Sequence, residues 1–256
     1  MNINWTQPIT VYELIAIALI IPLIKYIYNH FIKKLKVDFL PSGMITLFHN
    51  RSGSYISLGG VYEVKNKSTT IKEITAKVIR QSDNATLSLI WSTFPSPICR
   101  RVAGNFETSF ETAHPFKVEA DTLAPAFVEF VDKCANMDEV SNNILYPVVC
   151  ATMPIFSQPN ATLPIVDGVV RALPEYALAK IALNDHFFWK ADEYEMVITT
   201  IHSKGTFDKK YVFSLSDAES LRLRNNIDSV LISHVANHFG IPVQMNTVTK
   251  DFKGKK

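Results

Sequence analysis

The chain has 256 residues, of which 47% are hydrophobic and 20% are charged, and its formal net charge is +2. This balance agrees with a globular domain and gives no strongly basic surface, so no nucleic-acid partner is expected. The sequence contains no phosphate-binding glycine loop, no dinucleotide fingerprint and no nucleophile elbow, which argues against a phosphate-cradling enzyme or a doubly wound nucleotide-binding fold.

The first predicted element is an apolar helix at residues 11–31, preceded by a short N-terminus at residues 1–10. About 20 mostly apolar residues suffice to cross the hydrocarbon core of a bilayer. Residues 1–24 contain no Lys or Arg, whereas four lysines follow, at Lys25, Lys33, Lys34 and Lys36. The positive-inside rule places this flank, with the basic segment 32–37, in the cytoplasm and residues 1–10 outside. We therefore expect a single-pass membrane protein whose first partner is the lipid bilayer.

Other interpretations of this segment fit less well. A buried helix of the folded domain seldom has such one-sided flanking charge, and residues 14–24 lack the polar face of a helix lying flat on a membrane. A contrary signal comes from Asn-x-Ser/Thr sequons at Asn4, Asn50, Asn66, Asn84 and Asn160, which are typical of secreted chains. The three cysteines lack disulfide or metal spacing, which agrees with a reducing cytoplasm.

From about residue 38 the pattern becomes alternating, and residues 38–240 are interpreted as one β-sandwich domain. Runs rich in β-branched and aromatic residues occupy 44–48, 55–64, 73–80 and 87–94, at the spacing of an antiparallel, immunoglobulin-like sandwich. Gly59 and Gly60 interrupt the second run, which indicates a bulge or a close backbone approach. Trp91 is expected in the core. The predicted fold class is mainly β with a few helices.

Residues 95–125 are interpreted as an irregular insertion or inter-sheet connection, because four prolines punctuate a polar stretch. Long irregular connections often carry recognition. Arg100 and Arg101 lie close in sequence to Phe106 and Phe110, so this segment is a candidate surface for an anion or a protein partner. The alternative is a loop that covers a sheet edge with its aromatic side chains inward.

The remaining segments are expected to complete the sandwich. Residues 126–131 alternate as a strand, the proline-broken segment 146–165 predicts an extended edge or loop, and Pro174 begins a helix. Residues 195–203 and 210–214 predict a hairpin. Ser216 and Glu219 match a capping box for an amphipathic helix at 217–239, which Gly240 ends. Residues 241–256 are interpreted as a basic tail.

His234 and His238 lie one turn apart on this last helix, the spacing of two metal ligands, although a site would need further ligands from elsewhere. Their alternative role is that of core residues bonded to carbonyls. Asp185 and His186 form a candidate acid–base pair without a nucleophile motif.

The favoured function is a non-enzymatic binding module at the inner membrane face, with a protein partner or a second copy of itself and no cofactor. The alternative is a membrane-anchored hydrolase or metal-dependent enzyme that uses the histidines and Asp185. A third hypothesis, a pore formed by the apolar helix, depends on Glu13, because acidic residues within membrane helices are often functional.

Overall fold

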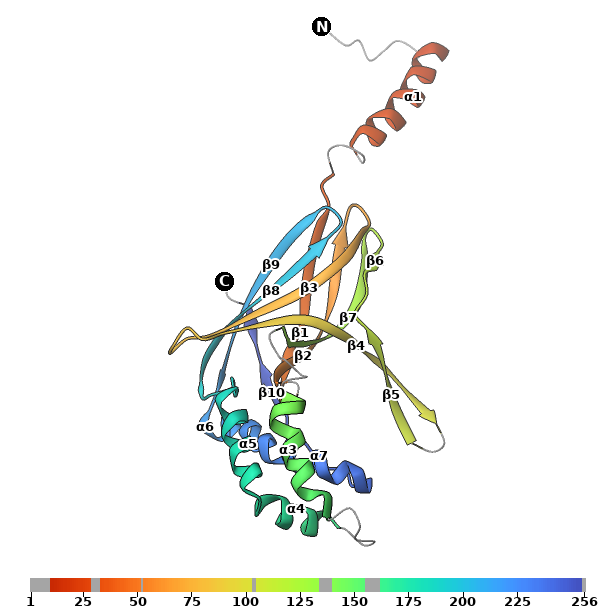
Figure 1. Ribbon diagram of the computed structural model, residues 1–256. Helices are drawn as coiled ribbons and strands as arrows, with labels where there is room; N and C mark the ends of the chain where they lie inside the picture. The colour runs from red at the N-terminus through yellow and green to blue at the C-terminus, as the bar shows by residue number, and fades with distance from the viewer. Residues whose placement is uncertain are drawn as a thin grey trace.

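The computed structural model describes residues 10–28, 33–51, 53–102, 105–133, 140–154 and 162–254. Within these ranges the side chains of residues 13, 94–102, 105–110 and 141 are not described. Helix α1 stands beyond one end of a curved sheet, and the other helices gather at the opposite end (Figure 1).

Helix α1 (Val11–Ile27) forms within the predicted apolar segment. Its apolar side chains are exposed on all sides, from 43% for Ile27 to 86% for Tyr12. Among the described residues, no helix combines the length and apolarity that a membrane crossing needs, and α1 has 17 residues.

The body of the protein is a single antiparallel sheet, which confirms the prediction of a mainly β chain with several helices. Its strands are β1 (Lys36–Asn50), β2 (Gly53–Lys65), β3 (Thr69–Arg80), β4 (Thr86–Val102), β5 (Asn105–Thr112), β6 (Phe116–Val118), β7 (Thr122–Asp132), β8 (Asp192–His202), β9 (Gly205–Leu215), β10 (Val248–Asp251) and β11 (Lys253–Gly254). Their order is β10-β1-β2-β7-β4-β3-β8-β9-β11, with β5 beside β4 and β6 beside β3. The strands belong to one continuous sheet, which corrects the predicted division into the two sheets of an immunoglobulin-like sandwich.

The C-terminal segment joins the two edges of this sheet. Strand β10 pairs with β1, whereas β11, one residue later, pairs with β9. The chain changes partner at Phe252, whose N–H donates to the carbonyl of Gly43 at 3.0 Å. The interpretation of residues 241–256 as a basic tail is therefore wrong for residues 248–254. Val248 and Phe252 are buried and hold the segment in place.

Residues 95–125 are largely extended strand, which corrects the predicted irregular insertion. Strand β4 continues to Val102 and pairs with β5, with a register shift between Pro95 and Cys99. Proline is tolerated in a sheet at edges and bulges, because the missing N–H then interrupts no ladder. Here β5 lies off the main path of the sheet and pairs only with β4 among the described strands.

The helical end contains α3 (Tyr146–Thr152), α4 (Leu163–Arg171), α5 (Pro174–Asp185), α6 (Asp217–Arg224) and α7 (Asn226–Ala236), with the π-helical turn η2 (Val140–Leu145) and the 3-10 turn η4 (Asn237–Phe239). Residues 146–165 were expected to be extended, but Pro147 and Pro164 lie in the first turns of α3 and α4, where a missing N–H costs nothing. The predicted helix 217–239 is divided into α6, α7 and η4.

The capping box at the start of α6 is confirmed, since Ser216 accepts from the N–H of Glu219 and Glu219 accepts from the N–H of Ser216. The predicted close approach at the glycine pair is also confirmed. A Cβ on Gly60 would lie 2.5 Å from Cζ of Phe39, and one on Gly59 would lie 3.1 Å from the Phe127 ring. Trp91 is buried, as predicted.

Candidate functional site

The predicted recognition residues lie on the β4–β5 hairpin. Arg101 is opposite Phe106 in the register, Arg100 is opposite Glu107, and Phe110 is opposite Pro95. These side chains lie outside the part of the structure that is described, so a binding role for Arg100, Arg101, Phe106 and Phe110 stays a prediction.

The two candidate metal-ligating histidines lie on α7 and on the 3-10 turn that follows it. His234 is half-buried, and this burial, followed by the charges of Arg51 and His238, lowers its pKa below the ordinary value. His238 is exposed. Across the described ranges, no group of three or more His, Cys, Asp or Glu side chains could hold a metal ion. The described residues therefore provide no third metal ligand beside His234 and His238.

The candidate acid–base pair lies at the end of α5. Asp185 is the last residue of the helix and His186 is its C-cap, and both are exposed. The next residue, Phe187, is buried and packs edge-on against His49, with 5.0 Å between ring centroids. Asp185 and His186 therefore form the end of α5, which the buried side chain of Phe187 fixes in place.

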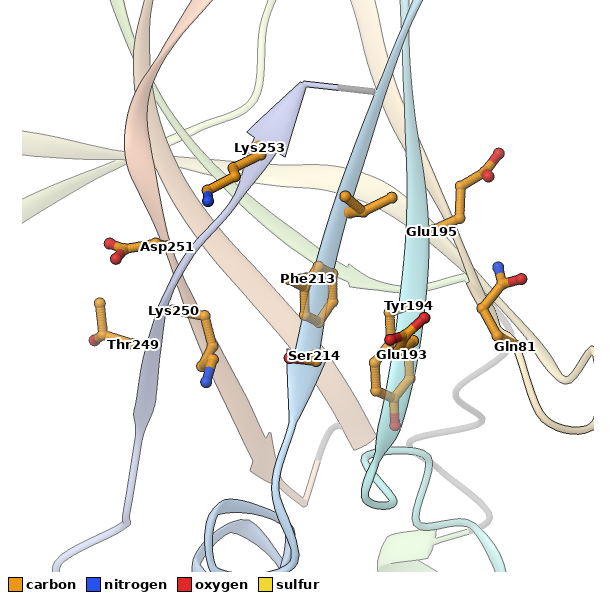
Figure 2. Close-up of a pocket in the computed structure, with 11 residues that line it drawn as sticks. Gln81, Glu193, Tyr194, Glu195, Phe213, Ser214, Thr249, Lys250, Asp251 and Lys253 are labelled. Carbon is orange, nitrogen blue, oxygen red and sulfur yellow. The ribbon is translucent and has the colours of Figure 1, made fainter. Parts of the chain in front are cut away.

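A groove lies where the C-terminal segment crosses from β1 to β9. Its volume is about 690 Å³, and its lining comes from Gln81, Glu193, Tyr194, Glu195, Val212, Phe213, Ser214, Thr249, Lys250, Asp251 and Lys253. Figure 2 shows Lys250 and Lys253 on the wall formed by β10 and β11, and Glu193 and Glu195 on the opposite wall from β8. We call this feature the β9–β10 groove.

The groove contains a short length of open sheet edge. On one side, β9 pairs with β8 along its whole length. On its other side, β11 covers only Tyr211 and Val212, because β10 has diverged to pair with β1. Among the described strands nothing pairs with this side of β9 from Phe213 to Leu215. Such an edge presents backbone N–H and C=O groups that an extended peptide can pair with.

An ion pair fixes the base of the groove. The Lys250 ammonium donates to both carboxylate oxygens of Glu219, at 2.9 and 3.1 Å. Burial alone would raise the pKa of Glu219, but the hydrogen bonds from Lys250 and Ser216 bring that pKa below its ordinary value. The pair joins β10 to the first turn of α6, which begins just after the end of β9.

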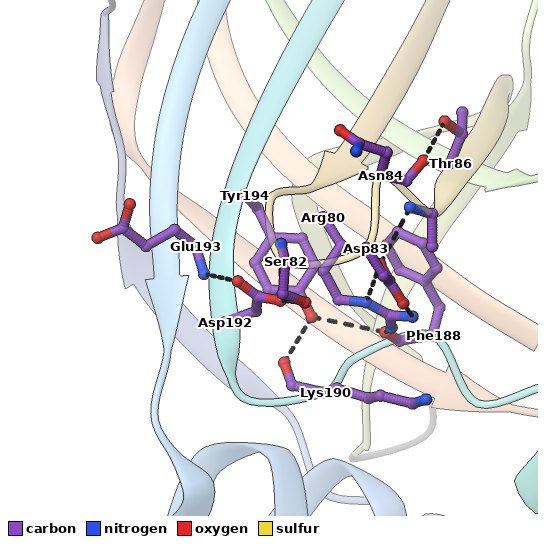
Figure 3. A network of polar contacts seen from close by, with 11 residues as sticks. Arg80, Ser82, Asp83, Asn84, Thr86, Phe188, Lys190, Asp192, Glu193 and Tyr194 are labelled. Carbon is purple, nitrogen blue, oxygen red and sulfur yellow. Dashed lines mark hydrogen bonds and ion pairs between the residues drawn. The ribbon is translucent and has the colours of Figure 1, made fainter.

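A second polar network supports the opposite wall (Figure 3). Arg80 donates to both carboxylate oxygens of Asp83, at 2.9 and 2.6 Å, and to the carbonyl of Phe188 at 2.6 Å. The hydrogen bonds from Arg80 and from the N–H of Ala85 lower the pKa of Asp83 to about 2. Ser82 also donates to Asp192, the first residue of β8. The network joins the β3–β4 turn to β8, and it thereby positions Gln81 beside Glu193.

The β9–β10 groove was missed in the sequence, because its walls come from segments far apart in the chain. The sequence pattern assigns Lys250 and Lys253 to the predicted basic tail. The only local signal was the pair of apolar residues Val248 and Phe252, four positions apart among polar residues, which is too sparse to predict a strand.

The comparisons with known proteins do not assign the chain to a family. No family model matches it, and no curated protein matches its sequence. Among solved structures, a family 123 glycoside hydrolase from Clostridium perfringens aligns with 72% of this chain at 8% identity and a TM-score of 0.30. The chain spans 28% of the length of that hydrolase. Likeness at this level supports no argument about fold or activity.

Proposed function

We propose that the protein is a non-enzymatic binding module, tethered by α1 to the inner face of a membrane, that binds an extended segment of a protein partner in the β9–β10 groove. The observation that carries the binding role is the open edge of β9 at Phe213–Leu215, beyond the two residues that pair with β11. A bound segment would add a strand there, with main-chain hydrogen bonds providing affinity and the walls providing selectivity.

The charges of the walls favour a segment with both signs of charge. Lys253 is exposed on one wall and Glu193 on the other. Opposite charges across a binding surface select the register of the partner more than they strengthen binding. A second copy of this chain and an unrelated protein are both compatible with this chemistry.

The tether is supported by the surface of α1. A helix that is apolar on all sides is normally buried in protein or in lipid. In this structure the apolar side chains of α1 are exposed, which leaves lipid as the medium that would cover them. Lys25, in the last turn of α1, is also exposed, as are Lys34 and Lys36 after the helix. By the positive-inside rule, these lysines support the proposal that the sheet lies on the cytoplasmic side.

Membrane attachment is tested by flotation of the full chain with vesicles at alkaline pH, which strips proteins that are held only by surface charge. We expect the chain to float with the lipid. Recovery in the aqueous fraction would overturn the tether. The topology is tested by protease treatment of intact cells, which should leave the sheet undigested.

Partner binding is tested by placing a photo-crosslinking residue at Ser214 in the full chain. The matched control places it at Lys77, which is exposed in β3 and does not line the groove. We expect Ser214 to form a discrete cross-linked product in membranes, and Lys77 to form none. Equal products from the two positions, or none from Ser214, would remove the groove as the binding site.

A further inference from the structure

The register of the sheet brings distant segments together at the end nearest α1. Strand β1 begins at Lys36, opposite Lys65 at the end of β2, and β7 begins at Thr122, opposite Val64. The first residue of β3, Thr69, lies opposite Val118 in β6. His202 lies opposite both Ile71 and Gly205, so the β8–β9 turn joins the same end. Figure 1 shows α1 beyond this end of the sheet.

These segments carry a set of lysines that we call the basic rim. Its members come from the α1–β1 linker and from three turns or strand ends: Lys33, Lys34, Lys36, Lys65, Lys67, Lys117 and Lys204. Carboxylates at the same end are fewer, namely Asp38, Glu63, Glu119 and Asp121. Asp38 pairs with Lys209, which lies outside the rim, at 2.6 Å. The rim therefore has a net positive charge.

The ion pairs within the rim are solvent-exposed. Lys65 lies 2.9 Å from Glu63, and Lys117 lies 2.8 Å from Glu119. Surface pairs of this kind contribute little to stability and are screened by salt. Their lysines can exchange these partners for other anions at small cost.

Hydrogen bonds hold the rim together as one surface. The side-chain amide of Asn66 donates to the carbonyl of Lys34 at 2.8 Å, and the backbone N–H of Asn66 donates to Asp121 at 3.0 Å. These bonds join the linker to the β2–β3 and β6–β7 turns. The hydroxyls of Thr69 and Ser203 lie 2.9 Å apart and bind the β8–β9 turn to β3. The lysines therefore project from a fixed frame.

We propose that the basic rim rests on the anionic headgroups of the bilayer to which α1 is attached, so that the protein has a defined orientation on the membrane. This inference depends on the tether proposed above. The linker from Ile27 to Lys36 contains eight residues, 28–35. Fully extended, it spans about 30 Å, so Lys36, where the rim begins, stays within about this distance of the end of α1. At such an imposed proximity, several weak lysine contacts with lipid act together.

Lysine labelling of the full chain in vesicles tests this orientation. The protein is reconstituted either in phosphatidylcholine alone or with about one third phosphatidylserine, and acetylation of each lysine is measured by mass spectrometry. Lys117 and Lys204 report on the rim, and Lys133 and Lys190, exposed near the other end of the sheet, are the references. We expect about fivefold or greater protection of the rim lysines on anionic vesicles, lost at high salt. Equal labelling in both vesicles would overturn the inference.

Charge reversal supplies a matched comparison. Lys117→Glu with Lys204→Glu should abolish the anionic-lipid protection of Lys65, whereas Lys133→Glu with Lys190→Glu should retain it. Protection of the rim by inorganic phosphate in neutral vesicles, without protection by phosphatidylserine, would also overturn the inference.

Flotation separates the two proposals. A chain that floats with both kinds of vesicle but shows unchanged lysine labelling would disprove only the orientation. A chain that fails to float with either would disprove the tether. Tryptophan fluorescence of each variant confirms that the sheet is folded, because Trp91 and Trp189 are buried.

Discussion

Replacement of Gly60 by alanine should destabilise the protein through a single added methyl group. Its Cβ would lie 2.5 Å from Cζ of Phe39 and 2.7 Å from the carbonyl oxygen of Leu40, whereas carbon atoms in favourable contact lie about 3.5 to 4.0 Å apart. Phe39 is 2% exposed and packs on Tyr62 at 5.1 Å between ring centroids, so its ring has little room to move. The oxygen of Leu40 belongs to the β1–β2 backbone. Overpacking of this kind costs about 1–3 kcal/mol.

Gly168 provides the matched control, because a Cβ there would meet nothing within 4 Å. Gly168 lies inside α4, and alanine in a helix interior is favoured over glycine by about 1 kcal/mol. Thermal unfolding of the full chain, followed by tryptophan fluorescence, should give a lower midpoint for Gly60→Ala and a higher one for Gly168→Ala. For a protein of this size, each 1 kcal/mol corresponds to about 2–4 °C. Equal midpoints for the two variants would refute the steric argument.

Two further predictions concern pH, and one concerns placement. Burial lowers the pKa of His49 to about 4, so the unfolded state takes up its proton first, and stability should fall as the pH drops from about 6.5 to 4. The free energy of unfolding of His49→Gln, measured with urea, should change less with pH in this range than that of the parent protein. The control variant His186→Gln, at an exposed position, should follow the parent. Parallel curves for His49→Gln and the parent would contradict this prediction. The pKa of Asp83 is held at about 2, chiefly by the hydrogen bond from Arg80. The ionised carboxylate of Asp83 therefore stabilises the fold above about pH 4, and this contribution is lost as the pH falls through 2. Asp83→Asn should remove this loss of unfolding free energy at low pH. If the variant kept the full loss, the network around Arg80 would not act through the carboxyl of Asp83. Asn84, exposed at a turn, should carry no glycan when the full chain is made in eukaryotic cells, and mass spectrometry showing a glycan there would contradict the cytoplasmic placement of the sheet.

Local patterns were enough to predict the central strands. In β3, Ile74, Ala76 and Val78 are buried, as their alternation with polar residues indicated. Side chains on successive strand residues point to opposite faces, so the sequence of a half-buried strand alternates between apolar and polar residues. The capping box at Ser216 is local in the same sense, because both of its hydrogen bonds join residues three positions apart.

Local patterns failed where pairing is distant or where proline gives a misleading signal. Strand β10 has four residues, of which only Val248 is apolar, and it is a strand because it pairs with β1, about 200 residues away in the chain, as in the contact of Thr46 with Thr249. Pro95 and Pro97 marked β4 as irregular, although strand pairing resumes beyond a register shift. The β9–β10 groove shows the first difficulty, because it exists only where a short, distant strand leaves the edge of β9.

The pairing of β1 with β10 also has a consequence for biosynthesis. While the chain is being made, β1 is among the first strands to leave the ribosome, yet one of its edges meets its neighbour only after residue 251 has been added. Contacts between distant residues slow folding and leave strand edges exposed meanwhile. Until β10 has been synthesised, one edge of β1 therefore lacks the neighbour that it has in the folded sheet, while its other edge can pair with β2.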